Sequence, residues 1–292
     1  MQILNKSSNC PFCYYKSYLV RKENSFNIYR CKKCFLLFVS PLPEKKKDTE
    51  IVQYWGDDNL TNSHSNINKY SKVNNFFLKI LKRYKSNDNY FSKVLDIGCG
   101  YGFFVKLLLE NNFDSYGLDI SKQSTYYASN HLGLEKIYCN DLSNEFFEDN
   151  FFDYIIALNL LEHVPDPANI INIIHNKIKK KGIFIIRVPN MSFHFNFRKI
   201  IQKIQKKKYS LIATTPPVHL YGYSYKNLGL LLENNKFKIL ETGPSKLGSS
   251  KKNNYLQNIF INIVNFFFKL IFFITFNQIN ISPSMYIVCK KL

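Results

Sequence analysis

The chain has 292 residues, 46% of them hydrophobic and 21% charged, and its 40 Lys and Arg against 21 Asp and Glu give a net charge of +19. This composition is that of a folded globular chain with room for about two domains, and it excludes a disordered or fibrous protein. Seven cysteines are too few for a disulfide scaffold. The start of the sequence has no basic stretch followed by an apolar run, which predicts a cytoplasmic location without a signal peptide.

Two C-x-x-C pairs near the start of the chain predict a metal site. Seventeen residues separate the pairs, which is the spacing of a zinc ribbon. The four cysteines are Cys10, Cys13, Cys31 and Cys34. Four sulfur ligands leave no coordination position for water, so we expect a structural rather than a catalytic Zn²⁺. The apolar run at 35–39 predicts a strand rather than an exposed surface for stacking bases, and the first domain is predicted over residues 1–43.

A longer domain is predicted over residues 44–292. The apolar spacing from Phe76 to Tyr84 indicates a helix. A short buried strand at 94–97 then leads into glycines at 98, 100 and 102, and a helix is predicted over 103–110. A glycine-rich turn between a strand and a helix brings backbone N–H groups close to a ligand, because a side chain there would block its approach.

Further strands alternate with helical segments to the end of the sequence. They are predicted at 115–119, 136–139, 152–157, 182–188, 236–241 and 284–290. Asp119 follows the glycine-rich turn by about twenty residues, the spacing at which a carboxylate accepts hydrogen bonds from ribose hydroxyls. The alternation predicts a doubly wound parallel α/β sheet with a ligand at the carboxyl ends of the strands.

Several segments resemble a known family. VLDIGCGYG at 94–102, the acid of YGLDIS, NDL at 140–142 and LNLLEHVPDP at 158–167 are similar to class I S-adenosylmethionine-dependent methyltransferases of the ubiquinone-biosynthesis and sugar-methyltransferase group. Some members of that group carry an N-terminal ribbon with two C-x-x-C pairs. The resemblance implies a Rossmann-like, seven-stranded methyltransferase sheet preceded by a small zinc ribbon, with S-adenosylmethionine as cofactor and a substrate insertion at 190–223.

The resemblance also assigns residues to the cofactor. It places Asp96, Gly98 and Gly100 around the methionine part, Asp119 on the ribose, Asp141 and Leu142 beside the adenine, and Asn159 at the sulfonium pocket. An Asp ahead of Leu142 and Ser143 is also typical of a helix N-cap, so both roles of Asp141 stay open at this point.

The candidates for proton transfer are Glu162, His163 and His219. A histidine accepts a proton near neutral pH, which assists a hydroxyl nucleophile. His219 is favoured because it lies in the predicted substrate insertion, whereas His163 equally fits a local structural hydrogen bond. Related sugar methyltransferases often carry Glu just before this histidine, and the Val218 found here favours O-methylation over carbanion formation. Tyr221 and Tyr223 are candidate donors of hydrogen bonds to the substrate, although in a chain with 20 Tyr such residues more often serve packing.

The positive charge is unevenly distributed. Residues 167–232 contain twelve Lys or Arg and no acid, and residues 242–292 contain six Lys and no acid. A/T-rich codons explain part of this excess, since Lys outnumbers Arg 35 to 5, and an anionic partner is the other explanation. We expect a small-molecule acceptor, such as a sugar, a glycan or a lipid-linked anionic metabolite. Methylation of RNA is the alternative, and a non-catalytic interaction protein is disfavoured by the intact glycine turn.

The most apolar stretch, 257–276, lies in a helical segment predicted over 252–278. Asn258, Asn262, Asn265 and Lys269 recur at helical spacing and form a polar stripe. A membrane-spanning helix is not expected, because strands on both sides belong to one sheet and no second apolar run returns the chain. Three roles stay open: an in-plane helix at the inner face of the membrane, a lid over the substrate, and a dimer contact.

Overall fold

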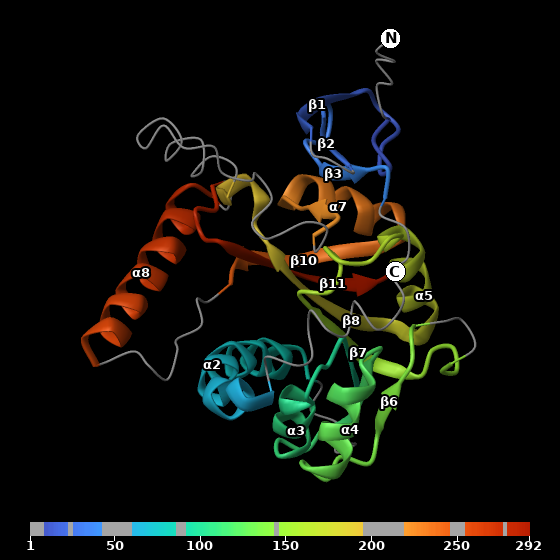
Figure 1. The fold of residues 1–292 in the computed structure, drawn as a ribbon, viewed down its shortest axis with the longest axis vertical. Coiled ribbons are helices and arrows are strands. Elements are labelled where there is room, and N and C mark those ends of the chain that lie inside the picture. Colours follow the sequence, from blue (N-terminus) through green and yellow to red (C-terminus); the bar gives the residue numbers. More distant parts are fainter. Residues whose placement is uncertain are drawn as a thin grey trace.

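The structure is a computed structural model that describes residues 9–22, 26–42, 60–85, 92–142, 146–194, 219–245, 255–276 and 279–292. Within these ranges, a seven-stranded and a four-stranded sheet form the framework, and helices cover both faces of the larger sheet (Figure 1). The predicted domain boundary after residue 43 and residues 195–218 of the predicted insertion lie outside the described residues.

The larger sheet has the strand order β10-β11-β8-β7-β4-β5-β6. Its strands are β4 (Lys93–Ile97), β5 (Asp114–Asp119), β6 (Ile137–Cys139), β7 (Phe152–Leu158), β8 (Ile178–Pro189), β10 (Phe237–Pro244) and β11 (Ser284–Lys291). Strand β11 runs antiparallel to both of its neighbours, and the other strands run parallel to one another. The prediction of a Rossmann-like α/β sheet is therefore confirmed, and every strand predicted for it is present.

Alternating side chains divide the core between the two faces of the sheet, as expected for strands buried on both sides. The helices are α2 (Leu60–Tyr84), α3 (Phe103–Leu109), α4 (Lys122–Asn130), α5 (Pro167–Lys177), α7 (Tyr225–Asn234) and α8 (Tyr255–Ile274). Leu95 of β4 faces the cluster that contains α5 and α7, whereas Val94 faces α2 and α3. Because the helices bury both faces, ligand access is limited to the edge where the strands end.

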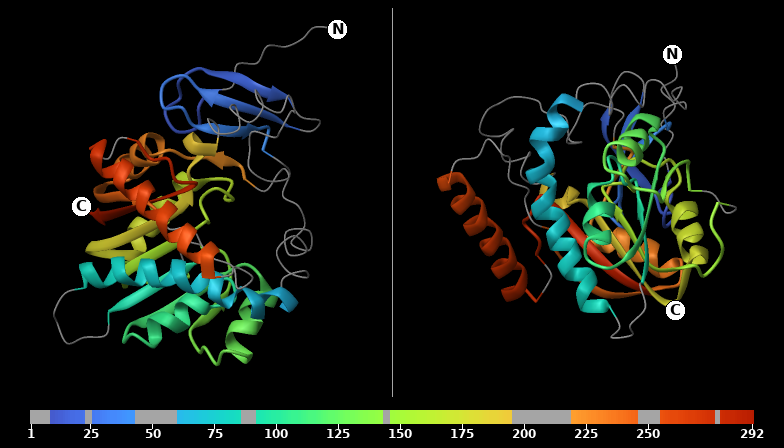
Figure 2. Two further views of the ribbon diagram at one scale, coloured as in Figure 1. Left: turned by 90° about the vertical axis from the view of Figure 1, so that its left-hand side faces the viewer. Right: turned by 90° about the horizontal axis from the view of Figure 1, so that it is seen from below.

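The smaller sheet joins the N-terminal ribbon to a distant part of the chain. Its strands are β1 (Ser17–Lys22), β2 (Asn27–Cys31), β3 (Leu37–Ser40) and β9 (Tyr221–Gly222), in that order (Figures 1 and 2). Leu37 pairs with Gly222 in antiparallel register. A Cβ atom on Gly222 would lie 2.6 Å from Met191 Cγ, so a glycine is required for this close approach. The sequence did not reveal this pairing, because strand β9 has only two residues.

Phe35 departs from the strand that the sequence predicts over 35–39. Strand β3 begins at Leu37, and Phe35 takes a left-handed φ of 62° in the turn after the second cysteine pair. The Phe35 ring is exposed between two cations, with Arg30 Cζ at 5.3 Å and Lys226 Nζ at 5.0 Å from its centroid. The ribbon therefore presents an aromatic ring on its surface, contrary to the prediction of a wholly strand-forming run.

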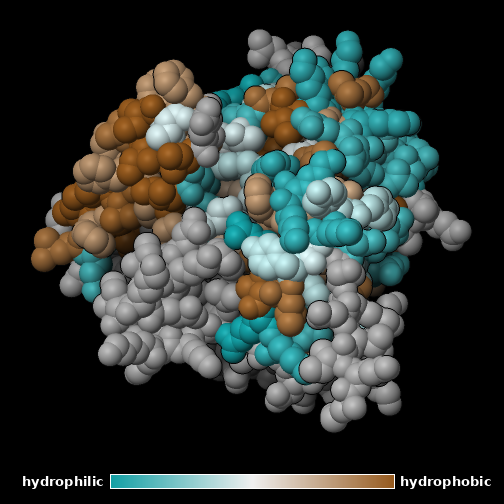
Figure 3. Space-filling model, turned by 90° about the horizontal axis from the view of Figure 1, so that it is seen from above, coloured by the Kyte–Doolittle hydropathy of each residue, from teal (hydrophilic) through white to brown (hydrophobic). Residues whose placement is uncertain are grey.

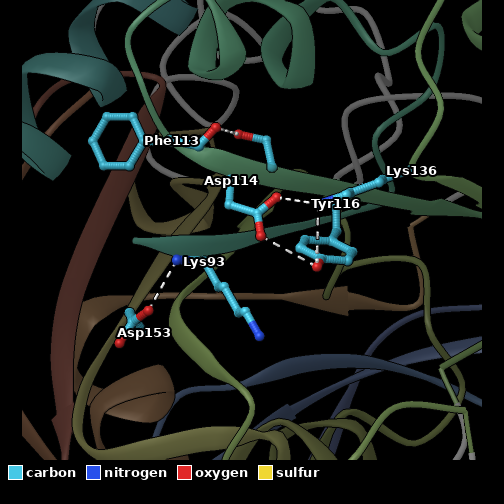
Figure 4. A network of polar contacts seen from close by, with 7 residues as sticks. Lys93, Phe113, Asp114, Tyr116, Lys136 and Asp153 are labelled. Carbon is cyan, nitrogen blue, oxygen red and sulfur yellow. Dashed lines mark hydrogen bonds and ion pairs between the residues drawn. The ribbon is translucent and has the colours of Figure 1, made fainter. Parts of the chain in front are cut away.

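Polar side chains tie the strands together at the amino-terminal edge of the sheet (Figure 4). The backbone N–H of Lys93 donates to Asp153 Oδ2 at 2.8 Å, which joins β4 to β7. Tyr116 donates its hydroxyl hydrogen to Asp114 Oδ2, and the Lys136 ammonium pairs with the other oxygen of Asp114. These contacts fix the strand ends opposite the glycine-rich turn.

Helix α8 follows β10 and precedes β11, and it runs beside α2 (Figure 2). Lys269 Nζ lies 5.7 Å from the ring centroid of Phe76 on α2, and the rings of Phe272 and Tyr225 lie 5.7 Å apart. Contacts with α2 and α7 thus hold one face of α8 against the body of the protein. Among the described residues, no helix is both long enough and apolar enough to cross a membrane.

Candidate active site

The turn after β4 depends on three glycines with left-handed backbone conformations. Gly98, Gly100 and Gly102 have φ values of 73°, 53° and 74°, a region that other residues adopt only with strain. A Cβ atom at Gly102 would lie 2.7 Å from Leu134 Cδ1, so this glycine is needed for packing. A Cβ atom at Gly100 would meet no described residue within 4 Å. The turn therefore opens at Gly100 onto space that a ligand can fill.

Asp119 lies beside this opening, at the carboxyl end of β5. Its Oδ2 accepts a hydrogen bond from the Gly100 N–H at 2.8 Å, and its Oδ1 accepts one from the Ser121 N–H at 2.9 Å. Burial raises the pKa of Asp119, although these backbone donors oppose the shift. Each carboxylate oxygen retains a second lone pair. The side chain is thus held in place with acceptor capacity for two ligand hydroxyls.

Asp96 contributes a second carboxyl group to the same region. Its side chain is almost fully buried near the end of β4. Burial, together with the negative charge of Asp119, raises the pKa of Asp96 to about 8. A cationic group bound nearby would stabilise the ionised forms of both carboxyls, because opposite charges favour ionisation.

The other residues assigned to the cofactor lie at the same edge. Asp141 is exposed two residues beyond β6, and Leu142 is buried. The N-cap role of Asp141 depends on residues 143–145, which lie outside the described residues, so both of its roles remain predictions. Asn159 follows β7 with a left-handed φ of 58°, and its side-chain oxygen accepts a hydrogen bond from Arg187.

Arg187 is a site residue that sequence reasoning missed. From β8 it donates to Ser245 Oγ at 2.9 Å and to Ser284 Oγ at 3.1 Å, in addition to the amide of Asn159. One guanidinium therefore holds the ends of four neighbouring strands, which its planar set of donors suits better than a lysine ammonium does. The available signal was its residue type, because only five of the 40 Lys and Arg residues of the chain are Arg.

The structure brings the three predicted proton-transfer residues together. His163 Nε2 lies 3.8 Å from Glu162 Oε1, and the ring centroids of His163 and His219 are 4.7 Å apart. Glu162 is buried, and within the described part of the chain neither of its carboxylate oxygens has a hydrogen-bond partner. Burial raises its pKa to about 8, while the charge of Arg187 opposes that shift.

Within this cluster, the ring of His219 is the best placed to accept a proton. Its Nδ1 is buried and has no hydrogen-bond partner among the residues that the structure describes. Burial, with smaller effects from His163 and His194, lowers its pKa to about 4. The ring is therefore neutral near pH 7, which is the form that accepts a proton. The ligand atoms of Glu162, His163 and His219 also lie within 4.8 Å of one another, a spacing compatible with a divalent cation.

The four ribbon cysteines form a second cluster with metal-ligand chemistry. The Sγ atoms of Cys10 and Cys34 are 3.5 Å apart, as are those of Cys13 and Cys31. Sulfurs placed tetrahedrally at about 2.3 Å from a zinc ion would be about 3.8 Å apart, so these separations are compatible with zinc. The Lys33 and Cys34 backbone N–H groups point to Cys31 Sγ at 3.3 and 3.4 Å, which favours a thiolate.

Strand β9 connects this cysteine cluster to the histidines. The ring of Phe12, between Cys10 and Cys13, stacks on the ring of Tyr221 at 5.6 Å and on that of Tyr223 at 6.1 Å. Strand β9 is also tied to the loop after β7, since the Leu220 N–H donates to the backbone oxygen of Glu162 at 2.7 Å. The ribbon thus supports the segment that carries His219.

Tyr221 and Tyr223 have structural roles. The Tyr221 hydroxyl donates to the Pro165 carbonyl at 2.8 Å, and the Tyr223 hydroxyl donates to the Leu161 carbonyl at 3.0 Å. Both side chains are buried. The prediction that they donate to the substrate is therefore wrong, because backbone carbonyls already accept their hydroxyl hydrogens.

Residues 68–242 match the family described as "Methyltransferase domain". The ubiquinone biosynthesis O-methyltransferase of Aliivibrio fischeri is 30% identical over 102 residues, which cover 33% of this chain and 44% of the relative. The protein of the same name from Rickettsia prowazekii is 33% identical over 117 residues, covering 38% and 46%. The matched segments thus span less than half the length of these curated relatives.

Solved structures share the fold at low sequence identity. A chain in the complex between the Haloferax volcanii Trm112 methyltransferase activator and a putative methyltransferase has a TM-score of 0.56 at 10% identity, covering 84% of this chain and 97% of that one. A SAM-dependent methyltransferase of Methanosarcina mazei has a TM-score of 0.51 at 19% identity, covering 73% and 97%. These similarities support the fold alone.

Proposed function

This chain belongs to the methyltransferase-domain family, and from that premise we propose that it transfers the methyl group of S-adenosylmethionine to an oxygen atom of a small acceptor. One arrangement carries the proposal: the turn that opens at Gly100 lies beside the fixed carboxylate of Asp119. A glycine turn and a carboxylate in these positions suit the methionine and ribose parts of the cofactor. The O-methyltransferase names of the curated relatives support oxygen as the acceptor atom.

The chain's own residues would orient the cofactor. Gly98, Gly100 and Asp96 would surround its methionine part, Asp119 its ribose, Asp141 and Leu142 its adenine, and Asn159 its sulfonium. Methyl transfer is a displacement in line with the leaving sulfur, so alignment of the two reactants supplies much of the rate.

We propose that His219 accepts the proton that the hydroxyl group of the methyl acceptor loses. A hydroxyl oxygen that forms the new O–CH₃ bond becomes positively charged as the S–CH₃ bond breaks, and its proton then becomes strongly acidic. A neutral histidine takes that proton even though its pKa is lowered to about 4. His163 would orient the ring of His219, which the 4.7 Å spacing of the two imidazole rings supports. Glu162, whose carboxyl lies within 4.8 Å of both histidines, would stabilise the imidazolium when it is ionised.

We further propose that the acceptor is anionic, as a sugar phosphate, glycan or lipid-linked metabolite would be. The acid-free segment 167–232 supports this chemistry, although two of its cations are already paired: Lys177 with Asp149 and Lys179 with Asp153, each at 2.7 Å. The remaining positive charge includes Lys206, Lys207 and Lys208, which lie outside the described residues. Replacing these three with Gln should raise KM for the acceptor more than it lowers kcat.

Zinc in the ribbon is part of the same proposal. Cys10, Cys13, Cys31 and Cys34 would hold a structural Zn²⁺, because all four sulfurs are close together and leave no position for a substrate. Bound zinc would stabilise the short ribbon, whose sheet extends through β9 to the segment that carries His219.

RNA methylation is the second candidate function. The exposed ring of Phe35 between Arg30 and Lys226 is the observation that favours it, because aromatic rings beside cations stack on bases. An RNA methyltransferase should bind single-stranded oligonucleotides with strong salt dependence and lose affinity in Phe35→Ala. A small-molecule enzyme should show neither property.

Mass spectrometry tests the favoured function. Metabolites and glycans of cells with and without the gene should differ by compounds that carry one additional methyl group. The purified chain should then transfer labelled methyl from S-adenosylmethionine to the unmethylated compound. His219→Ala should lower kcat strongly, whereas His131→Ala, at an exposed histidine beyond α4, should not. Transfer at the wild-type rate by His219→Ala would rule out its role as the proton acceptor.

A further inference from the structure

Helix α8 has an apolar face that the protein body does not cover. Side chains on the inner side of the helix, such as Phe272, pack against the body. The exposed apolar side chains are Leu256, Ile259, Phe260, Ile263, Phe266, Phe267, Leu270, Phe273 and Ile274. Because successive residues of an α-helix are rotated by about 100°, these positions cover an arc of about 140° on the outer side. The helix therefore has an inner and an outer apolar face.

The outer face forms one continuous hydrophobic patch, visible at the left of Figure 3. Its largest side chains are well exposed: Phe260 to 67%, Phe267 to 52% and Phe273 to 77%. Soluble monomers rarely expose a contiguous apolar patch of this kind, and such patches mark interaction sites. Exposed polar residues, Asn262 and Lys269, border the patch.

The surroundings of the patch carry positive charge. Neither α8 nor the neighbouring α2 contains an Asp or Glu. Lys269 of α8 and Lys79 of α2 are exposed, and Lys79 lies one helical turn from Phe76, whose ring Lys269 approaches. An apolar face flanked by lysines is complementary to a surface that is apolar below and anionic above, which is the arrangement of an anionic bilayer.

We propose that the outer face of α8 docks in the plane of an anionic membrane, with its phenylalanines at the boundary between headgroups and acyl chains. A second copy of this chain fits less well, because a two-fold contact through α8 would bring two acid-free, lysine-bearing surfaces together. The inner face stays packed on the body, so the helix anchors the protein at the surface.

Docking through α8 would also bring the active-site edge close to the membrane. The segment that follows α8 is fastened to that edge, since the Asn190 side-chain amide donates to the Asn280 and Ser282 carbonyls at 2.9 Å. Arg187, which holds Asn159, also donates to Ser284 at the start of β11. The proposal rests on the patch and its charges and does not depend on the identity of the acceptor.

Flotation of the full chain with lipid vesicles tests this proposal. Vesicles of phosphatidylcholine with one-third phosphatidylglycerol should carry the chain, and pure phosphatidylcholine vesicles should carry less. The variant Phe260→Ser/Phe267→Ser/Phe273→Ser should lose binding by more than about a hundredfold, because each buried phenylalanine contributes about tenfold or more. The matched control Leu109→Ser/Tyr126→Ser/Leu292→Ser alters exposed apolar residues elsewhere and should bind as the wild type does.

A second variant separates charge from apolar burial. Lys79→Gln/Lys269→Gln should reduce binding to the anionic vesicles, and added NaCl should do the same, while binding to phosphatidylcholine stays unchanged. Melting temperatures near the wild-type value should show that the variants fold. Equal vesicle binding by the triple Phe variant and the wild type would overturn the proposal. A wild-type dimer that the triple variant converts to monomers, without vesicle binding, would overturn it in favour of a second copy.

Discussion

The ring of Phe12 stacks on the ring of Tyr221, with centroids 5.6 Å apart and ring planes inclined by 26°. Phe12 lies within the first cysteine pair, and Tyr221 lies two residues after His219. The Val39 N–H reinforces the link by donating to the Leu220 carbonyl at 3.0 Å. The position of His219 therefore depends on a domain that is remote from it in the sequence.

Phe12→Ala should loosen strand β9 without affecting the cofactor site. The side chain is nearly fully buried, so its removal costs about 3 kcal/mol or more of local packing. Amide exchange at 220–222 should become faster, and the Kd of S-adenosylhomocysteine should not change. Phe35→Ala, at the exposed ring of the same ribbon, serves as the control. Unchanged exchange in Phe12→Ala would show that the ribbon does not hold β9.

Removal of zinc should have the same local effect. The chain purified without chelator should contain one zinc ion, and Cys13→Ser with Cys31→Ser should abolish it. Since zinc binding and ribbon folding are coupled, metal loss should expose β1 to β3 and increase exchange at β9. Elemental analysis and exchange mass spectrometry measure both effects. A metal-free chain with the exchange pattern of the wild type would contradict the structural role of zinc.

Three glycine substitutions separate backbone strain from loss of ligand space. Gly133→Ala should cost about 1 kcal/mol, because Gly133 has a φ of 67° in otherwise open space. Gly100→Ala should cost a similar amount but also weaken cofactor binding, since its methyl group enters the ligand space. Gly102→Ala should destabilise most, because its Cβ would overlap Leu134 and Ala128. Denaturation and calorimetry should give this order, and normal cofactor affinity in Gly100→Ala would be inconsistent with it.

Asp96 should make the stability of the cofactor-free chain depend on pH. Its pKa is raised to about 8 in the folded chain, so the folded state holds the proton more tightly than the unfolded state does. The stabilisation is complete below about pH 4 and is lost as the pH rises through about 8. Asp96→Asn cannot ionise and should gain stability relative to the wild type from pH 5 to pH 9, by a few kcal/mol at most. A difference in melting temperature that is independent of pH would contradict the buried, uncharged Asp96.

The sequence was sufficient to locate the strands of the larger sheet, but their order within the sheet was not predicted from it. Hydrophobic runs such as 94–97 and 152–157 are buried on both faces, and this pattern is strong enough to predict without coordinates. The cysteine spacing likewise predicts a cluster that the structure shows. Glu162, His163 and His219 were each candidates for proton transfer from the sequence, but their grouping was not predicted, since His219 is far from the other two in the chain.

Other features depend on contacts that no local pattern reveals. Strand β9 has only two residues, which are too few to indicate a partner strand. The sequence around Tyr221 and Tyr223 does not indicate that their hydroxyl groups donate to backbone carbonyls. Arg187 contacts residues from three other segments, among them Ser245 and Ser284. The exposed Phe35 resulted from a left-handed turn that hydrophobicity alone does not encode.

Calorimetric titration with S-adenosylhomocysteine tests the central claim that the cofactor binds beside Gly100 and Asp119. The wild type should bind one molecule, and Asp119→Ala should weaken binding by about tenfold to a hundredfold, because hydrogen bonds from ribose hydroxyls to a charged group are lost. Asp114→Ala, at the other end of the same strand, should bind as the wild type does. No binding to the wild type, or equal affinity in Asp119→Ala, would contradict the account.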